Sequence, residues 1–251
     1  MRSYEKEIEK MVECLKKRDI DKKDFFDILE KADTFYENPE LEFQLLLSNG
    51  LPLEIIDEKV RLKTRVTPIN EQKFCIIDIE TNGSKVPYGQ IIEIAAIKIQ
   101  NGEIIDSYES LVYAKEIPEY IQEVTKITPQ MLKDAPSLKD VLLEFRVFLD
   151  DTVFVAHDIK FDYNFVSESM YNYGYGKLHN RKLCTIDLAK RTIKSEKYGL
   201  VALKEILNID IPIHHRAYSD ALSTKFIFDE ALKALPPKVC YTEELISFSK
   251  K

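Results

Sequence analysis

The chain has little that would mark a secreted, membrane-bound or zinc-binding protein. Its four cysteines include no C-x-x-C pair, which argues against a zinc site built from cysteines. It also lacks any stretch of about 18 apolar residues, so no membrane span or membrane partner is expected. The charged N-terminus has no apolar core of the kind that signal peptides contain. The expected compartment is therefore a reducing cytoplasm.

Basic residues are fewer than acidic ones. The chain has 36 lysines and arginines against 43 aspartates and glutamates, a formal net charge of −7. Such a protein does not hold nucleic acid by bulk charge, so any contact with nucleic acid must be local. The 251 residues, 45% of them hydrophobic, are enough for one sizeable domain and a smaller one.

We expect three parts, residues 1–68, 69–235 and 236–251. In the first part, apolar residues recur at helical spacing in three segments, and the alternating stretch 53–66 then predicts a hairpin. Three helices followed by a hairpin resemble a winged helix. The alternative, a small helical cap or docking module, fits the pattern better.

The second part reads as an α/β domain. Residues 73–80, "KFCIIDIE", form a nearly continuous apolar run that is typical of a strand buried on both faces. Two further strands are separated by Asn101-Gly102, a strong hairpin signal, and helices then alternate with strands. The third part has no clear fold of its own. Its Leu245 and Phe248 resemble the apolar residues of short peptides that dock on sliding clamps.

Three short motifs carry carboxylates. Asp78 and Glu80 are two residues apart on a predicted strand, so both side chains project from the same face. Burying two carboxylates side by side is costly unless a cation neutralises them, although the pair could also lie solvated at a strand end. Asp162 opens a predicted helix after the strand 152–157, where ligands often bind in α/β sheets. Alone, it could simply cap that helix.

The third motif contains His215 and Asp220. Five residues correspond to about 140° beyond a full helical turn, so the two side chains would not share a helix face. We therefore expect His215 in a loop and Asp220 in the first turns of a helix, which Leu222, Phe226, Phe228 and Leu232 would anchor to the sheet. A histidine can accept a proton from water near neutral pH. The alternatives are a surface histidine and a transition-metal site shared with its neighbour at position 214.

Taken together, these motifs resemble those of the DnaQ-like, or DEDDh, 3′–5′ exonucleases, which include the proofreading epsilon subunit of bacterial DNA polymerase III. The resemblance covers about residues 72–232. It rests on "IDIETNG" at 77–83, "IIEIAAIKI" at 91–99, "VAHDIKFDYNF" at 155–165 and "HRAYSDA" at 215–221.

The resemblance implies an RNase H-like fold, a mixed sheet flanked by helices. It also implies two divalent metal ions, Mg²⁺ or Mn²⁺, bound by Asp78, Glu80, Asp162 and Asp220, with His215 as the catalytic base.

Four more residues are implied at the substrate. Thr81 and Asn82 would touch the terminal nucleotide, and His157 and Phe161 would line or support its pocket, although Phe161 could equally be a core residue. The chain departs from the family at Asp158, where asparagine is usual, and at 125–128, where "TKIT" replaces "HGIT". Neither departure removes a metal ligand.

The expected activity is a metal-dependent 3′–5′ exonuclease that releases 5′-mononucleotides from single-stranded or frayed DNA 3′ ends. Proofreading or DNA repair is the expected role, and a DNA polymerase subunit is the expected partner. The alternatives are an exoribonuclease that trims RNA 3′ ends and a catalytically silent module that binds a polymerase.

Overall fold

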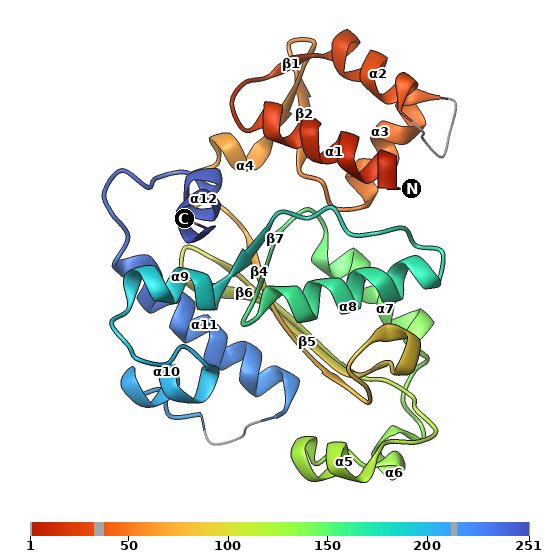
Figure 1. Cartoon of the computed structure of the whole chain (residues 1–251), viewed down its shortest axis with the longest axis vertical. Coiled ribbons are helices and arrows are strands. Elements are labelled where there is room, and N and C mark those ends of the chain that lie inside the picture. Colours follow the sequence, from red (N-terminus) through yellow and green to blue (C-terminus); the bar gives the residue numbers. More distant parts are fainter. Residues whose placement is uncertain (1, 33–37, 212–214, 251) are drawn as a thin grey trace.

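The computed structural model describes residues 2–32, 38–211 and 215–250. Two modules follow one another along the chain, a small N-terminal one and a larger one built on a central sheet (Figure 1). Among the described residues, no helix combines the length and the apolar character needed to cross a membrane.

The N-terminal module has the helix and strand order of a winged helix. Its sheet has the antiparallel order β1-β3-β2, and the β2–β3 turn places Asp57 and Glu58 at φ 48° and 56°, as type I′ hairpins require. The winged-helix resemblance of this module stays a prediction, as does the alternative of a cap or docking module. Its elements are α1 (Arg2–Leu15), β1 (Ile20–Asp21), α2 (Lys22–Lys31), α3 (Pro39–Ser48), β2 (Leu53–Ile56) and β3 (Lys59–Leu62).

The larger module has a mixed five-stranded sheet in the order β6-β5-β4-β7-β8. The central strand β4 pairs antiparallel with β5 and parallel with β7, and β7 pairs parallel with β8. The carboxyl ends of β4, β7 and β8 therefore meet at one edge of the sheet. The strands are β4 (Phe74–Thr81), β5 (Ile91–Gln100), β6 (Glu103–Leu111), β7 (Val153–Ala156) and β8 (Lys182–Cys184).

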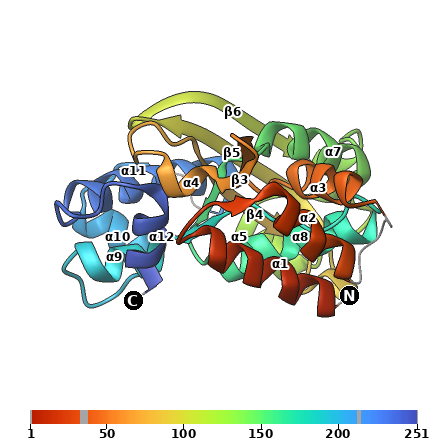
Figure 2. The same ribbon diagram turned by 90° about the horizontal axis from the view of Figure 1, so that it is seen from above.

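Helices cover both faces of this sheet, as expected for an RNase H-like fold (Figures 1 and 2). Side chains of α7 and α8 pack on one face around Ile77 and Phe145, while α9, α11 and α12 pack on the other around Ile76 and Phe228. The helices are α4 (Lys63–Val66), η1 (Val86–Tyr88), α5 (Glu119–Thr125), α6 (Pro129–Leu132), α7 (Leu138–Leu149), α8 (Ile159–Asn172), α9 (Thr185–Thr192), α10 (Leu200–Ile206), α11 (Ala217–Lys233) and α12 (Thr242–Lys250).

The C-terminal segment differs from the expected unstructured tail. It forms α12, whose Leu245 is fully buried in the core on the α11 face of the sheet, while Phe248 packs against the same core. The expectation that these two residues dock on a sliding clamp is therefore wrong, because the fold already uses them. The anchoring of α11 is also only partly as expected, since Phe226 is 42% exposed.

The two modules meet along a polar seam. Glu243 of α12 accepts hydrogen bonds from Arg181 at 2.6 Å and from Thr64 of α4 at 2.7 Å. Gly50, at φ 82°, packs directly on Asn180, and a Cβ there would lie 2.1 Å from the Asn180 side chain. Only glycine fits this approach, so the module junction is specified by backbone shape as well as by charge.

Candidate active site

The first carboxylate pair lies at the carboxyl end of the central strand. Asp78 and Glu80 of β4 pair with Ala95 and Glu93 of β5, and the register shifts just after Glu80. Side chains alternate along a strand, so Asp78 and Glu80 point to the same face as Ile76. Ile76 belongs to the core on the α11 side of the sheet, and both carboxylates therefore lie on that side. The predicted shared face is therefore present.

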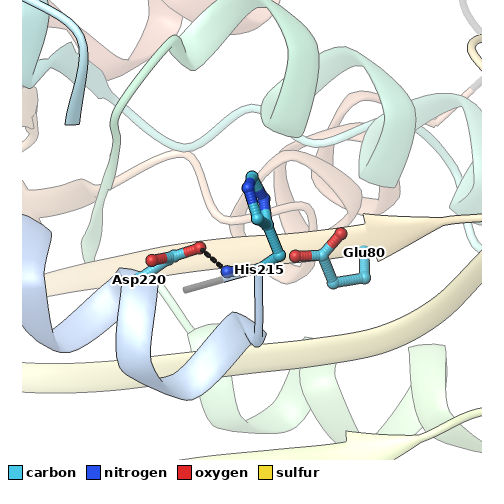
Figure 3. Close-up of side chains that lie close together, drawn as sticks. All are labelled: Glu80, His215 and Asp220. Atoms are coloured by element: carbon cyan, nitrogen blue, oxygen red, sulfur yellow. Dashed lines mark hydrogen bonds between the residues drawn. The ribbon is translucent and has the colours of Figure 1, made fainter. Parts of the chain in front are cut away.

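His215 and Asp220 reach the same place from the far end of the chain. His215 precedes α11, whose first turn carries Asp220. Ligand atoms of Glu80, His215 and Asp220 all lie within 4.8 Å of one another (Figure 3). The expected arrangement of loop and helix is thus observed. The neighbouring histidine at position 214, part of the alternative transition-metal site, lies outside the described residues.

The backbone of His215 is held by the neighbouring carboxylate. Its N–H donates to Asp220 Oδ2 at 2.9 Å, and its φ is 58°, in the left-handed region (Figure 3). Its side chain is exposed, whereas Asp220 is only 6% exposed. The imidazole is therefore accessible to water and substrate at the mouth of a buried acidic site.

Asp162 completes the acidic group from the other face of the sheet. It lies in the first turn of α8, and its side chain is 4% exposed. Burial raises the pKa of Asp78 well above its usual value, and repulsion from Asp162, Glu80 and Asp220 raises it further. Asp78 therefore lies close enough to the other three carboxylates for their charges to act on it.

The donor set fits divalent cations. Burial, followed by repulsion from Asp220 and Glu93, raises the pKa of Glu80 to about 8. Hard carboxylate oxygens are the ligands that Mg²⁺ and Mn²⁺ prefer, and a cation would remove the repulsion that these shifts express. Asp78, Glu80, Asp162 and Asp220 are the residues that would hold it.

Glu93 is a candidate positioning residue that the sequence reasoning missed. It is buried in β5, and its carboxylate accepts hydrogen bonds from Arg216 at 2.6 and 3.0 Å and from the Ala217 N–H at 2.9 Å. It therefore binds the residue after His215 and also neutralises the amino end of α11. Its sequence signal was an acidic residue inside a largely apolar strand, whose other charged residue is Lys98.

Replacing Glu93 with Gln should lower the rate of catalysis more than it lowers stability. Gln keeps the shape of Glu93 but loses the charge that holds Arg216, so the His215 segment loses its fixed position. We expect kcat to fall about tenfold and KM to change little. The double variant Glu93→Gln/Arg216→Gln is the control, because it shows whether the loss in the single variant comes from leaving the Arg216 charge without its carboxylate partner. A rate equal to that of the wild type in the single variant would contradict the positioning role.

A buried lysine contacts the chain at Ile211, on the N-terminal side of His215. Lys204 of α10 is 5% exposed, and its Nζ donates to the Ile211 carbonyl at 2.6 Å. Burial lowers the pKa of Lys204, while attraction from Asp220 opposes that shift. Polar contacts therefore fix the chain on both sides of His215, at Ile211 and at Arg216.

Thr81 and Asn82 shape the connection between β4 and β5. Thr81 Oγ1 donates to the Gly83 carbonyl at 2.9 Å. The Asn82 side chain accepts from the Gln90 N–H at 2.7 Å and donates to the Glu116 carbonyl at 3.1 Å. Both residues therefore lie beside the acidic edge, with their side chains engaged in this connection.

His157 and Phe161 flank the start of α8. His157 Nδ1 lies 2.8 Å from Thr185 Oγ1, and burial lowers the pKa of His157 to about 4, so its ring is neutral at neutral pH. Phe161 is 38% exposed and contacts Phe165 with ring centroids 5.7 Å apart. Part of the Phe161 side chain thus remains exposed, next to Asp162 in the sequence.

The sequence matches an exonuclease family and a region of larger relatives. The exonuclease family model, RNase_T, matches residues 75–228. The DNA polymerase III PolC-type protein of Staphylococcus haemolyticus is 37% identical over 184 residues, which cover 71% of this chain and 13% of that protein. The corresponding protein of Staphylococcus aureus is 36% identical over 187 residues, which cover 73% and 12%. The chain thus spans about an eighth of the length of these relatives.

Solved structures share the fold. Exonuclease X in complex with 5′ overhanging duplex DNA has a TM-score of 0.54 at 23% identity, over 70% of this chain and 99% of that one. Escherichia coli exonuclease I in complex with a dA16 oligonucleotide has a TM-score of 0.59 at 16% identity, over 71% and 43%. The family match and the RNase H-like sheet lead to one conclusion: the chain belongs to the DnaQ-like exonuclease family.

Proposed function

We propose that the protein is a metal-dependent 3′–5′ exonuclease that removes nucleoside 5′-monophosphates from single-stranded or frayed DNA 3′ ends. The observation that carries this proposal is the convergence of Glu80, His215 and Asp220 within 4.8 Å, next to Asp78 and Asp162. A base beside several hard oxygen ligands is the set that hydrolysis of a phosphodiester with two metal ions requires.

In this mechanism His215 acts as the general base. Its exposed imidazole takes a proton from the attacking water, and the tethers at Ile211 and Arg216 keep it in position. Asp78, Glu80, Asp162 and Asp220 would hold two Mg²⁺ or Mn²⁺ ions, which would supply Lewis-acid chemistry at the attacking water and at the leaving 3′ oxygen. The neutral His157 and the exposed face of Phe161 would contact the terminal nucleotide, together with the backbone at Thr81 and Asn82.

The relatives support a role in DNA replication. The matched region is shared with chains named DNA polymerase III PolC-type, so we propose proofreading or repair as the setting and a polymerase as the partner. Because the match spans only a small part of those chains, the exonuclease activity must be measured on this protein itself.

The test is a Mg²⁺-dependent assay on one mismatched primer, labelled either at its 3′ or at its 5′ end. We expect immediate release of the 3′ label as a mononucleotide, stepwise shortening of the 5′-labelled strand, and no reaction in EDTA. An RNA oligonucleotide of the same sequence runs in parallel. Preference for RNA would favour the exoribonuclease, and absence of metal-dependent release would favour the binding module. Release from the 5′ end would contradict the polarity.

A further inference from the structure

Basic side chains gather at one place on this acidic protein, where α8, β8, α9 and α12 meet. Two adjoining hollows share Asp187, Ser249 and Lys250 among their lining residues. Asp187 is the one acidic residue among those that line either hollow. The basic residues that line them, here called the basic patch, are Lys160, Lys182, Lys190, Arg191 and Lys250.

Two of the five cations of the basic patch lie over aromatic rings. Lys182 Nζ lies 4.1 Å from the centroid of the Tyr163 ring, and the Arg191 guanidinium lies 5.7 Å from that of Phe248. Lys190 Nζ lies 3.9 Å from Asp187 Oδ1, but both side chains are about half exposed, so this ion pair is weak. Asp187 therefore cancels little of the positive charge of the patch.

Neighbouring cations in this region repel one another. Burial lowers the pKa of Lys250, and repulsion from Arg181, Lys16 and Lys182 lowers it further, against an opposing attraction from Glu243. A bound polyanion would relieve this repulsion. The adjoining hollow on the other side carries both signs of charge, since its lining includes Glu5, Glu9, Glu13 and Glu168 as well as Lys177, Arg181, Lys182 and Lys250. The excess of positive charge therefore lies in the two hollows beside α9 and α12.

The basic patch begins at the edge of the sheet that carries the acidic site. Cys184 ends β8, lines one hollow and pairs with Ala156, the last residue of β7. Lys160 lies in the same first turn of α8 as Asp162. From there the patch continues along α9 to the end of α12, which lies against α9 (Figure 1).

We propose that the basic patch binds the phosphate backbone of the substrate strand, several nucleotides away from the 3′ terminal nucleotide. This inference rests on the proposed function for the choice of ligand. Lysines on a continuous surface that starts beside the cleavage site are suited to successive phosphates. Lys250 lies beyond residues 75–228, the family match, so this chain adds part of the path through its own C-terminal helix.

The test neutralises three residues of the patch that lie outside the catalytic site. We compare Lys182→Gln/Lys190→Gln/Lys250→Gln with a control, Lys23→Gln/Lys31→Gln/Lys59→Gln, which removes the same charge from exposed sites on the N-terminal module. Binding of fluorescent oligothymidylates of about twelve and about three nucleotides is measured by anisotropy in Ca²⁺ over a range of salt concentrations. Hydrolysis of the p-nitrophenyl ester of thymidine 5′-monophosphate reports the catalytic site alone.

The patch variant should bind the long oligonucleotide at least about tenfold more weakly than the wild type. The slope of log affinity against log salt concentration should be smaller in magnitude by about 2. Its binding of the short oligonucleotide and its ester hydrolysis should equal those of the wild type, and the control should match the wild type throughout. Unchanged affinity for the long strand, or an equal loss in the control, would overturn the inference. So would stronger binding of an oligoglutamate peptide than of the long strand. If the wild type hydrolyses neither ester nor strand but still binds the long strand through the patch, the proposed function fails and this inference stands.

Discussion

Asp78→Asn should reduce nucleotide release by about a thousandfold or more, and Asp220→Asn should do the same. Each change removes one carboxylate from a buried acidic cluster, in which burial first and repulsion second raise the pKa of Asp78 and of Glu80. Fewer negative charges mean weaker binding of divalent cations at the place where the water must be activated. Release of the 3′ label under saturating Mg²⁺ gives the rate directly.

Asp106→Asn is the matched control, since Asp106 is exposed on the outer strand β6, away from the acidic edge. It should retain the wild-type rate. Near-normal activity of Asp78→Asn or of Asp220→Asn would refute the assignment of these residues as ligands.

Asp78→Asn should stabilise the metal-free protein. A higher stability would show that the variant loses activity for a reason other than unfolding. Folding raises the pKa of Glu80 from 4.5 to about 8, so the folded state binds more protons and metal-free stability falls as pH rises across that window. Asp78→Asn relieves part of the repulsion, so its melting temperature in EDTA should exceed that of the wild type at pH 8. Saturating Mg²⁺ should then stabilise the wild type more than the variant.

His215→Asn should lower kcat by about 10²–10⁴-fold while the affinity for metal stays close to that of the wild type. Asparagine suits this position because it tolerates the left-handed backbone, here at φ 58°. The variant therefore removes the base without straining the backbone at position 215. Single-turnover rates measure the chemical step.

Binding of Mn²⁺, followed by electron paramagnetic resonance, separates a base from a ligand. Asp220→Asn should weaken Mn²⁺ binding strongly, whereas His215→Asn should leave it nearly unchanged. Because an imidazole nitrogen of His215 lies within 4.8 Å of the Glu80 and Asp220 oxygens, ligation is the competing role. An equal loss of Mn²⁺ affinity in both variants would contradict the assignment of His215 as base.

The sequence by itself determined the features that depend on neighbours in the chain. Strand alternation placed Asp78 and Glu80 on one face, and helix geometry separated His215 from Asp220. Asn101 and Gly102 form the predicted turn, with φ 51° and 78°. These are local rules of backbone sterics, so no knowledge of distant contacts is needed to apply them.

Only the tertiary structure decided which distant surfaces meet. Glu93 binds Arg216 across 123 residues, and Glu243 of the supposed tail joins Arg181 and Thr64 at the junction of the modules. Phe226 was expected in the core and is exposed, because the side of α11 that faces the sheet is set by packing and not by periodicity alone. Such contacts depend on how whole elements pack, which a single sequence does not specify locally.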